Sequence, residues 1–207
     1  HYMGHPAEMD TIMAIANKHG IPVIEDPSHA HGGLYKGKLV WTGTALSDQA
    51  ADGAWSCPYE TSSGLPPIIK VGNGTGSTPT LMGFGDDADK LVVITDGSEQ
   101  MKLVAFWRDG IPDDFVQKEG TASRRIAGQT QVTCGFGELP QWLQSEQSVV
   151  VNGYGAFVVN NIPETVSDDL KNANKILQVS LMGPAYATSY GVERLAWDPD
   201  RDQWSSV

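Results

Sequence analysis

Histidine and cysteine are scarce in this chain of 207 residues, and histidine is confined to one end of it. All five histidines lie in the first 31 positions, so a Ser-His-Asp triad is excluded from residues 41–207. The two cysteines, Cys57 and Cys134, form no CxxC pair and indicate neither a zinc site nor a disulfide framework. They are either two buried free thiols or one bridge.

The chain also lacks long apolar runs and an excess of basic over acidic residues. No apolar run reaches about eighteen residues, so the sequence predicts no membrane-spanning helix. A net charge of −11 disfavours non-specific binding to nucleic acid or to anionic membranes. We therefore expect no nucleic-acid and no membrane partner, whereas a small-molecule ligand stays open and the oligomeric state is not indicated. With 40% apolar and 19% charged residues, a globular protein is expected.

The rare residues divide the chain in two. All six tryptophans lie after position 40, while the histidines lie before it. Residues 1–40 hold four acids and three lysines, whereas 41–207 hold 21 acids and 11 lysines or arginines. This asymmetry predicts an αβ segment over 1–40 and a β-rich domain over 41–207. Because the chain begins at His1 without a leader, we expect a fragment, a processed chain or an incomplete reading frame.

The first part has the pattern of a helix followed by a strand. Apolar residues at 9, 12, 13 and 16 form one helical stripe, and Gly20 is a good helix stop. A short apolar run over 21–24 then ends at Glu25 and Asp26. In parallel α/β sheets, ligands sit at the carboxyl ends of strands, so polar groups after this run are candidate ligand contacts.

The second part predicts an antiparallel meander. Short runs rich in β-branched and aromatic residues are separated by turn material: "PTLMGFG", "DKLVVITDG", "MKLVAFW", "QVTCGFG", "QSVVVNG" and "GAFVVNN". Residues 44–67 are turn-rich and predict a long connection, and 167–178 favours a helix only slightly over a loop. The predicted fold class is mainly β, with antiparallel meanders that are partly β-propeller-like, preceded by a short α/β segment.

The run "GHPAEMDTIMAIANKHGIPVIEDPSHAHGGLYKG" closely resembles the DegT/DnrJ/EryC1/StrS family of nucleotide-sugar aminotransferases over residues 4–38. The resemblance implies pyridoxal phosphate (PLP) as cofactor and amino transfer from glutamate to a keto-sugar. By position, Asp26 would hold the pyridinium nitrogen protonated, and His29 would contact the phenolic oxygen. After Val40 the resemblance stops, and Lys70 is the next lysine, the one candidate for the Schiff base. Since its flanks do not match and the phosphate cup is missing, we expect no activity from the chain as it stands.

From residue 41 on, the chain weakly resembles part of a bacterial quinoprotein-like or six-bladed β-propeller. The segments "GNGTGSTPTLMGFGDDADKLVVITDG" and "GVERLAWDPDRDQW" carry this resemblance. It implies an alternative function, a non-enzymatic binding or scaffold module with an N-terminal graft.

Several smaller patterns predict structure rather than chemistry. The Gly-rich run over 71–80 can cradle a phosphate, but it lacks the ending of a P-loop, so a tight loop is expected. The aspartates over 86–89 and 198–202 predict acidic hairpin tips rather than calcium loops, because the glycine of such a loop is absent. His29 and His31 have no evident third ligand, so no metal site is predicted. We expect the tryptophans to pack in the core and at the rim rather than to form a platform for sugars.

Overall fold

The computed structural model describes residues 8–21, 23, 34–35, 38–39, 53–68, 70, 72–163, 165–181 and 191–207. The chain divides into two compact units, His1–Trp55 and Ser56–Val207. The composition boundary near residue 40 stays a prediction. Within the described residues, no helix is both long and apolar enough to cross a lipid bilayer.

The first unit contains the predicted helix, α1 (Met9–His19), and a small antiparallel pair, β1 (Leu34–Tyr35) with β2 (Lys38–Leu39). Gly20 ends the helix in the left-handed conformation with φ 64°, which a glycine adopts without steric cost. The amide of Ile21 then donates to Ala16 O at 3.0 Å, which closes the helix end. Helix and stop are therefore confirmed, whereas the predicted strand over 21–24 lies largely outside the described residues.

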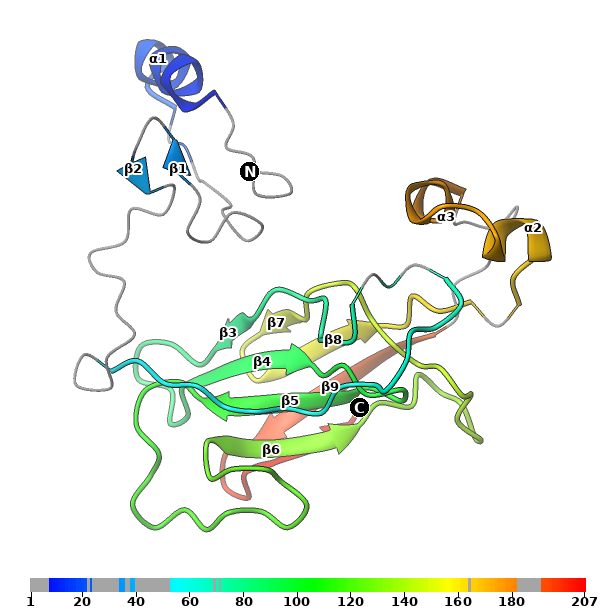
Figure 1. Ribbon diagram of the computed structural model, residues 1–207. Coiled ribbons are helices and arrows are strands. Elements are labelled where there is room, and N and C mark those ends of the chain that lie inside the picture. Colours follow the sequence, from blue (N-terminus) through cyan, green and yellow to red (C-terminus); the bar gives the residue numbers. More distant parts are fainter. Residues whose placement is uncertain are drawn as a thin grey trace. The chain divides into compact units, whose positions relative to one another are not determined.

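The second unit consists of two four-stranded antiparallel sheets (Figure 1). In each sheet the strands pair in the order in which they occur along the chain. The first sheet contains β3 (Thr80–Met82), β4 (Leu91–Thr95), β5 (Lys102–Trp107) and β6 (Ile126–Gln131). The second contains β7 (Val150–Asn152), β8 (Gly155–Val159), β9 (Val192–Asp198) and β10 (Gln203–Ser206).

The two sheets share one hydrophobic core. It combines residues such as Leu91 and Leu103 of the first sheet with Val158 and Leu195 of the second. The first strands, β3 and β7, lie beside each other, and so do the last strands, β6 and β10. A Cβ at Gly128 of β6 would stand 2.8 Å from the ring of Trp197, so only glycine fits this close approach of the two sheets.

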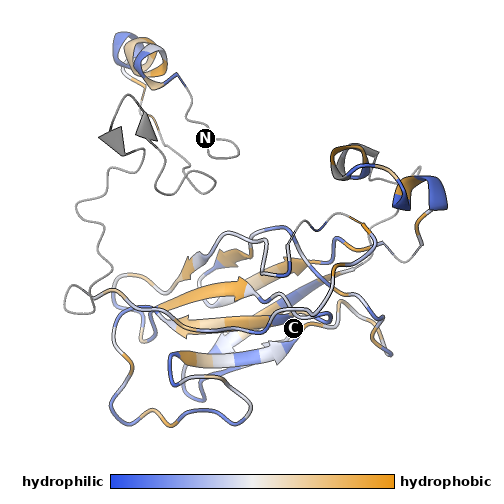
Figure 2. Cartoon of the chain, viewed as in Figure 1, coloured by the Kyte–Doolittle hydropathy of each residue, from blue (hydrophilic) through white to orange (hydrophobic). Residues whose placement is uncertain are grey.

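The outer faces of the two sheets differ. Strands β8 and β9 alternate between buried and more exposed residues, as expected for a sheet with one covered face. Strand β5 is instead buried on both faces, and Figure 2 shows β4 and β5 as the most continuously hydrophobic strands. The irregular segment over 56–66 lies along the first sheet: the Gly97 amide donates to Glu60 O at 2.9 Å, and Ser62 N donates to Gly97 O at 2.7 Å.

The prediction of a mainly β chain is confirmed, and the propeller resemblance is not supported. The described strands of the second unit form two open four-stranded sheets and neither a closed barrel nor a propeller ring. Five of the six predicted strand runs contain a strand, but the run over 131–137 is wrong apart from Gln131, because β6 occupies Ile126–Gln131 instead. After β6 the chain turns at Cys134 (φ 49°), where Oε2 of Glu193 accepts the amide of Cys134 at 2.9 Å.

The predicted helix over 167–178 is present as two short helices, α2 (Asp168–Lys171) and α3 (Lys175–Leu181). Ser167 caps the first, since its hydroxyl accepts the amide of Leu170 at 3.3 Å. Oδ1 of Asn174 accepts the amide of Leu177 at 2.9 Å, which starts the second helix after the break. Leu170 packs with Ile68 in a small cluster of its own.

Candidate functional site

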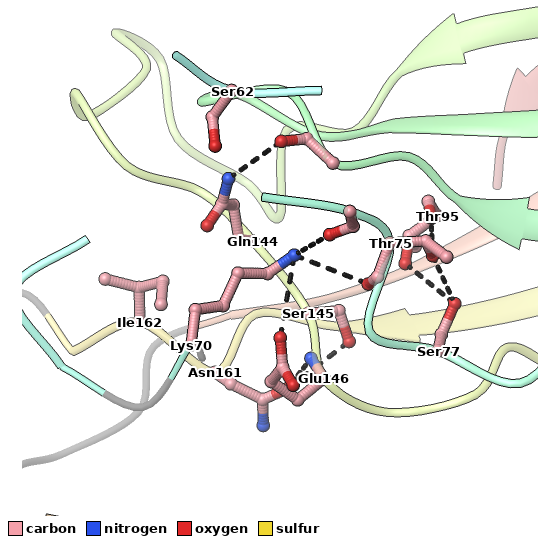
Figure 3. Close-up of polar contacts among 12 residues, drawn as sticks. Ser62, Lys70, Thr75, Ser77, Thr95, Gln144, Ser145, Glu146, Asn161 and Ile162 are labelled. Carbon is pink, nitrogen blue, oxygen red and sulfur yellow. Dashed lines mark hydrogen bonds and ion pairs between the residues drawn. The ribbon is translucent and has the colours of Figure 1, made fainter. Parts of the chain in front are cut away.

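Lys70 is the one predicted site residue that the structure describes, and its side chain has no exposed surface. Its Nζ donates to Gly74 O at 2.6 Å and to Thr75 O at 3.4 Å, and it lies 3.5 Å from Oε1 of Glu146 (Figure 3). Burial lowers the pKa of Lys70, and the nearby carboxylate of Glu146 opposes this effect. The ammonium is therefore held inside the protein by three oxygen atoms.

The Gly-rich loop over 72–77 closes around this ammonium. A Cβ at Gly97 would collide with Asn73 O and stand 2.8 Å from the carbonyl carbon of Gly74. A Cβ at Gly76 would collide with the carboxylate of Glu146. Because Gly97 and Gly76 lack side chains, the backbone of the loop can lie close to the backbone at Gly97 and to the carboxylate of Glu146. The loop presents carbonyl oxygens to a cation, whereas a phosphate cradle presents amides. The prediction of a tight loop is confirmed.

The surroundings of Lys70 do not fit PLP. A lysine that forms a Schiff base needs an accessible amine, and here Nζ is enclosed and bonded to protein oxygens. Asp26 and His29 lie outside the described residues, so their contacts with the cofactor stay a prediction. The catalytic role of Lys70 likewise stays a prediction, and the observed geometry supports a structural role.

Four loops meet at one end of the two sheets, which we call the loop end. They are the segment 60–68, the β4–β5 loop, the β6–β7 loop and the described part of the β8–β9 connection. The fully buried Gln144 joins three of them: its Nε2 donates to Ser98 O at 2.8 Å, and its amide donates to Oδ1 of Asn160 at 3.2 Å. Met101 N also donates to Leu143 O at 2.8 Å. The loop end is thus a connected structure and not a set of independent loops.

Two pockets open at the loop end and share Gln141. The first, of about 570 Å³, has a more apolar than polar lining that includes Phe136, Pro140, Trp142 and Pro163, together with Glu138 and Lys171. The second, of about 620 Å³, has a polar lining that includes Glu60, Ser63, Gln100, Lys102 and Gln131. We call the two pockets together the loop groove.

The opposite end of the sheets carries the acidic hairpin tips. The predicted tips are confirmed as the β3–β4 and β9–β10 turns, and Oδ2 of Asp89 accepts the indole N–H of Trp197 at 2.6 Å across them. Burial raises the pKa of Asp89, and the nearby Asp200 adds to this rise. Among the described residues, no group of three or more His, Cys, Asp or Glu is arranged to hold a metal.

Desolvation also raises the pKa of other acidic groups of the second unit, which we call the β unit. Burial is the largest cause of a raised pKa at four carboxyls, which are Asp89, Asp96, Glu146 and Asp202. Both cysteines are free, so the bridge left open by the sequence is wrong, and of the two expected buried thiols only Cys134 is buried. Burial raises the pKa of the Cys134 thiol to about 11, so this cysteine is a poor nucleophile.

The prediction that the tryptophans pack in the core and at the rim is confirmed for the core by three of them. Trp107, Trp197 and Trp204 belong to the shared core, as expected. Trp142 is instead half-buried and lines the loop groove next to Gln141. The signal that points to it is the loop sequence "ELPQWLQ", where a tryptophan lies between two glutamines outside any predicted strand.

Comparison with known proteins finds two kinds of similarity, one over a short N-terminal segment and one over most of the chain. Residues 1–47 match the DegT/DnrJ/EryC1/StrS aminotransferase family, in agreement with the resemblance seen over 4–38. A dTDP-3-amino-3,4,6-trideoxy-alpha-D-glucose transaminase of Streptomyces venezuelae is 38% identical over 47 residues, or 23% of this chain and 12% of that protein. An uncharacterised protein of Archaeoglobus fulgidus is 38% identical over 171 residues, or 82% of this chain and 31% of that protein.

The chain spans less than a third of the length of these two curated relatives. No solved structure matches the chain. The aminotransferase resemblance is therefore limited to the short N-terminal segment, and the long similarity is to a protein without an assigned function.

Proposed function

We propose that the β unit of this chain is a non-catalytic binding module whose recognition surface is the loop groove. The observation that carries the proposal is the pair of neighbouring pockets that share Gln141 on one end of two packed sheets. Loops held by a rigid scaffold are common places for binding residues, and concave sites with an apolar lining and a few polar groups are the usual ligand sites.

We further propose that the aminotransferase-like segment over 1–47 contributes no amino transfer in this chain. The enclosed ammonium of Lys70 supports this proposal, because it is held by Gly74, Thr75 and Glu146 rather than available to a cofactor. This segment would then be part of a fusion or a fragment of an aminotransferase, and PLP would not be required for the binding function.

Incubation with PLP, reduction with borohydride and peptide mass spectrometry test this part of the proposal. We expect PLP to label lysines according to their exposure, so Lys171, whose side chain is 43% exposed, is labelled and Lys70 is not. One equivalent of PLP on Lys70, lost in Lys70→Ala and accompanied by glutamate-dependent amino transfer, would show that the chain is an aminotransferase.

A further inference from the structure

The chemistry of the loop groove indicates what it binds. We propose that its ligand is a neutral oligosaccharide, with one sugar ring against Trp142 and Phe136 and the next ring along the polar pocket. This inference rests on the proposed binding function and names its ligand class. The two pockets are neighbours, because Gln141 lines both of them, and an extended ligand can reach from one to the other.

The two halves of the groove match the two kinds of surface on a sugar ring. A pyranose has C–H groups on its faces, which pack on aromatic rings, and hydroxyl groups around its edge. Phe136 and Trp142 supply ring surfaces in the first pocket, where both are half-buried and thus partly accessible. Large aromatic side chains with few rotatable bonds provide contact area at a low entropy cost.

Several polar groups of the groove are acceptors that a ligand rich in donors can engage. The Nε2 atoms of Gln100 and Gln131 already donate to Pro140 O and Met101 O, both at 3.0 Å, so their amide oxygens are left to accept. Glu138 adds a carboxylate. Sugar hydroxyls donate to such oxygens and also accept from the amide of Gln141, which is exposed.

The charges in the groove disfavour an anionic ligand. In the polar pocket Lys102 lies 2.5 Å from Oε1 of Glu60, so these charges are paired within the protein. In the apolar pocket Lys171 is paired with Asp168 at 3.1 Å. With Lys102 and Lys171 engaged in this way, the described lining residues offer no cationic cluster for a phosphate or a carboxylate ligand.

A proline-rich peptide is the main rival, because it also stacks on exposed tryptophan. Such a peptide offers few donors, since proline has no N–H, and it would leave the oxygens of Glu138, Gln100 and Gln131 to water. Oligosaccharides satisfy both halves of the groove, and the peptide is therefore an outcome that the test must separate.

Isothermal titration of the full chain with neutral hexasaccharides tests the proposal, using gluco-, manno-, xylo- and N-acetylglucosamine oligomers. We expect at least one to bind and to change the tryptophan fluorescence. Trp142→Ala should weaken binding about tenfold or more, as expected for loss of an aromatic contact at the centre of a site. Gln141→Ala, an exposed position, should also weaken it and serves if Trp142→Ala does not fold. The matched control is Phe84→Ala, an aromatic side chain 58% exposed in the β3–β4 turn, which should leave binding unchanged.

Three results would overturn the oligosaccharide assignment. In the first, no hexasaccharide binds the folded wild-type chain, and in the second, binding persists unchanged in both groove variants. In the third, a polyproline decapeptide binds in a Trp142-dependent manner while sugars do not. The last result would leave the binding function intact and change only the ligand class. Failure of the binding function itself would be seen separately, if neither a hexasaccharide nor the polyproline decapeptide binds the folded wild-type chain.

Discussion

The enclosed ammonium of Lys70 makes a quantitative prediction about stability. Replacing Lys70 by Met keeps much of the side-chain volume but leaves Gly74 O, Thr75 O and the carboxylate of Glu146 without their donor. Breaking a buried ion pair by removing one partner costs about 3–5 kcal/mol. The side chain of Glu146 is 26% exposed, so water can solvate part of its charge, and we expect a loss near the lower limit, about 3 kcal/mol.

Urea unfolding of the full chain, followed by tryptophan fluorescence, measures this loss. With a slope of about 2 kcal/mol per molar urea, the midpoint should fall by about 1.5 M. Lys171→Met is the matched control, because Lys171 is 43% exposed and its partner Asp168 is 89% exposed. Exposed ion pairs contribute between about 0 and 1 kcal/mol, so this variant should unfold close to the wild type.

The double variant Lys70→Met with Glu146→Gln separates the pair from the two carbonyl contacts. Because the carboxylate is no longer left unpaired, the double variant should be less destabilised than the sum of the two single variants. If Lys70→Met and Lys171→Met lose equal stability, the loop over 72–77 does not depend on the ammonium and the structural role of Lys70 is wrong.

Three further predictions follow from burial. The four carboxyls with raised pKa bind more protons in the folded than in the unfolded state over a window of pH. This window extends from the ordinary pKa, 3.8 for Asp and 4.5 for Glu, up to the raised pKa of each group. Stability should therefore fall as pH rises through that window. We expect the thermal midpoint to be higher at about pH 5 than at pH 7, and this difference should be smaller in Asp89→Asn. A midpoint that rises with pH would contradict the prediction. Under native conditions a thiol reagent should modify Cys57, which is partly exposed, and reach Cys134 only after unfolding, so equal rates would contradict the buried position of Cys134. Gly97→Ala should destabilise the chain by about 1–3 kcal/mol in urea unfolding, because its Cβ meets the backbone of the Gly-rich loop, whereas Gly110→Ala, with nothing within 4 Å, should change stability little.

Much of the fold could be predicted from local patterns, because strands with alternating or continuous apolar residues carry a strong signal. The first helix and the strand runs that contain β3, β4, β5, β7 and β8 were predicted in this way. Strand β6 was missed because its sequence "IAGQTQ" has few large apolar residues; its Gly128 is selected by the ring of Trp197 on the other sheet. A requirement set by a distant residue leaves no local pattern.

The site was less predictable than the fold. Lys70 stands out in the sequence because it precedes a Gly-rich run, but its partner Glu146 lies far along the chain in the β6–β7 loop. The loop groove brings Gln100 of the β4–β5 loop together with Gln141 and Trp142 of the β6–β7 loop, which lie about 40 residues further along the chain. Spacing along the sequence cannot show this, and so the tryptophans were all assigned to packing.

The sequential strand order of the sheets has a consequence for how the chain folds. All pairings of the first sheet lie within residues 80–131 and join neighbouring strands, so they close short loops. In the second sheet, β8 must find β9 across the connection from residue 160 to 191, which is a more costly loop to close. We expect the first sheet to be the earlier part of the folding nucleus and the β8–β9 pairing, together with the Lys70–Glu146 contact, to form late. Changes to the loop end would then mainly affect the rate of unfolding and leave the rate of folding nearly unaltered.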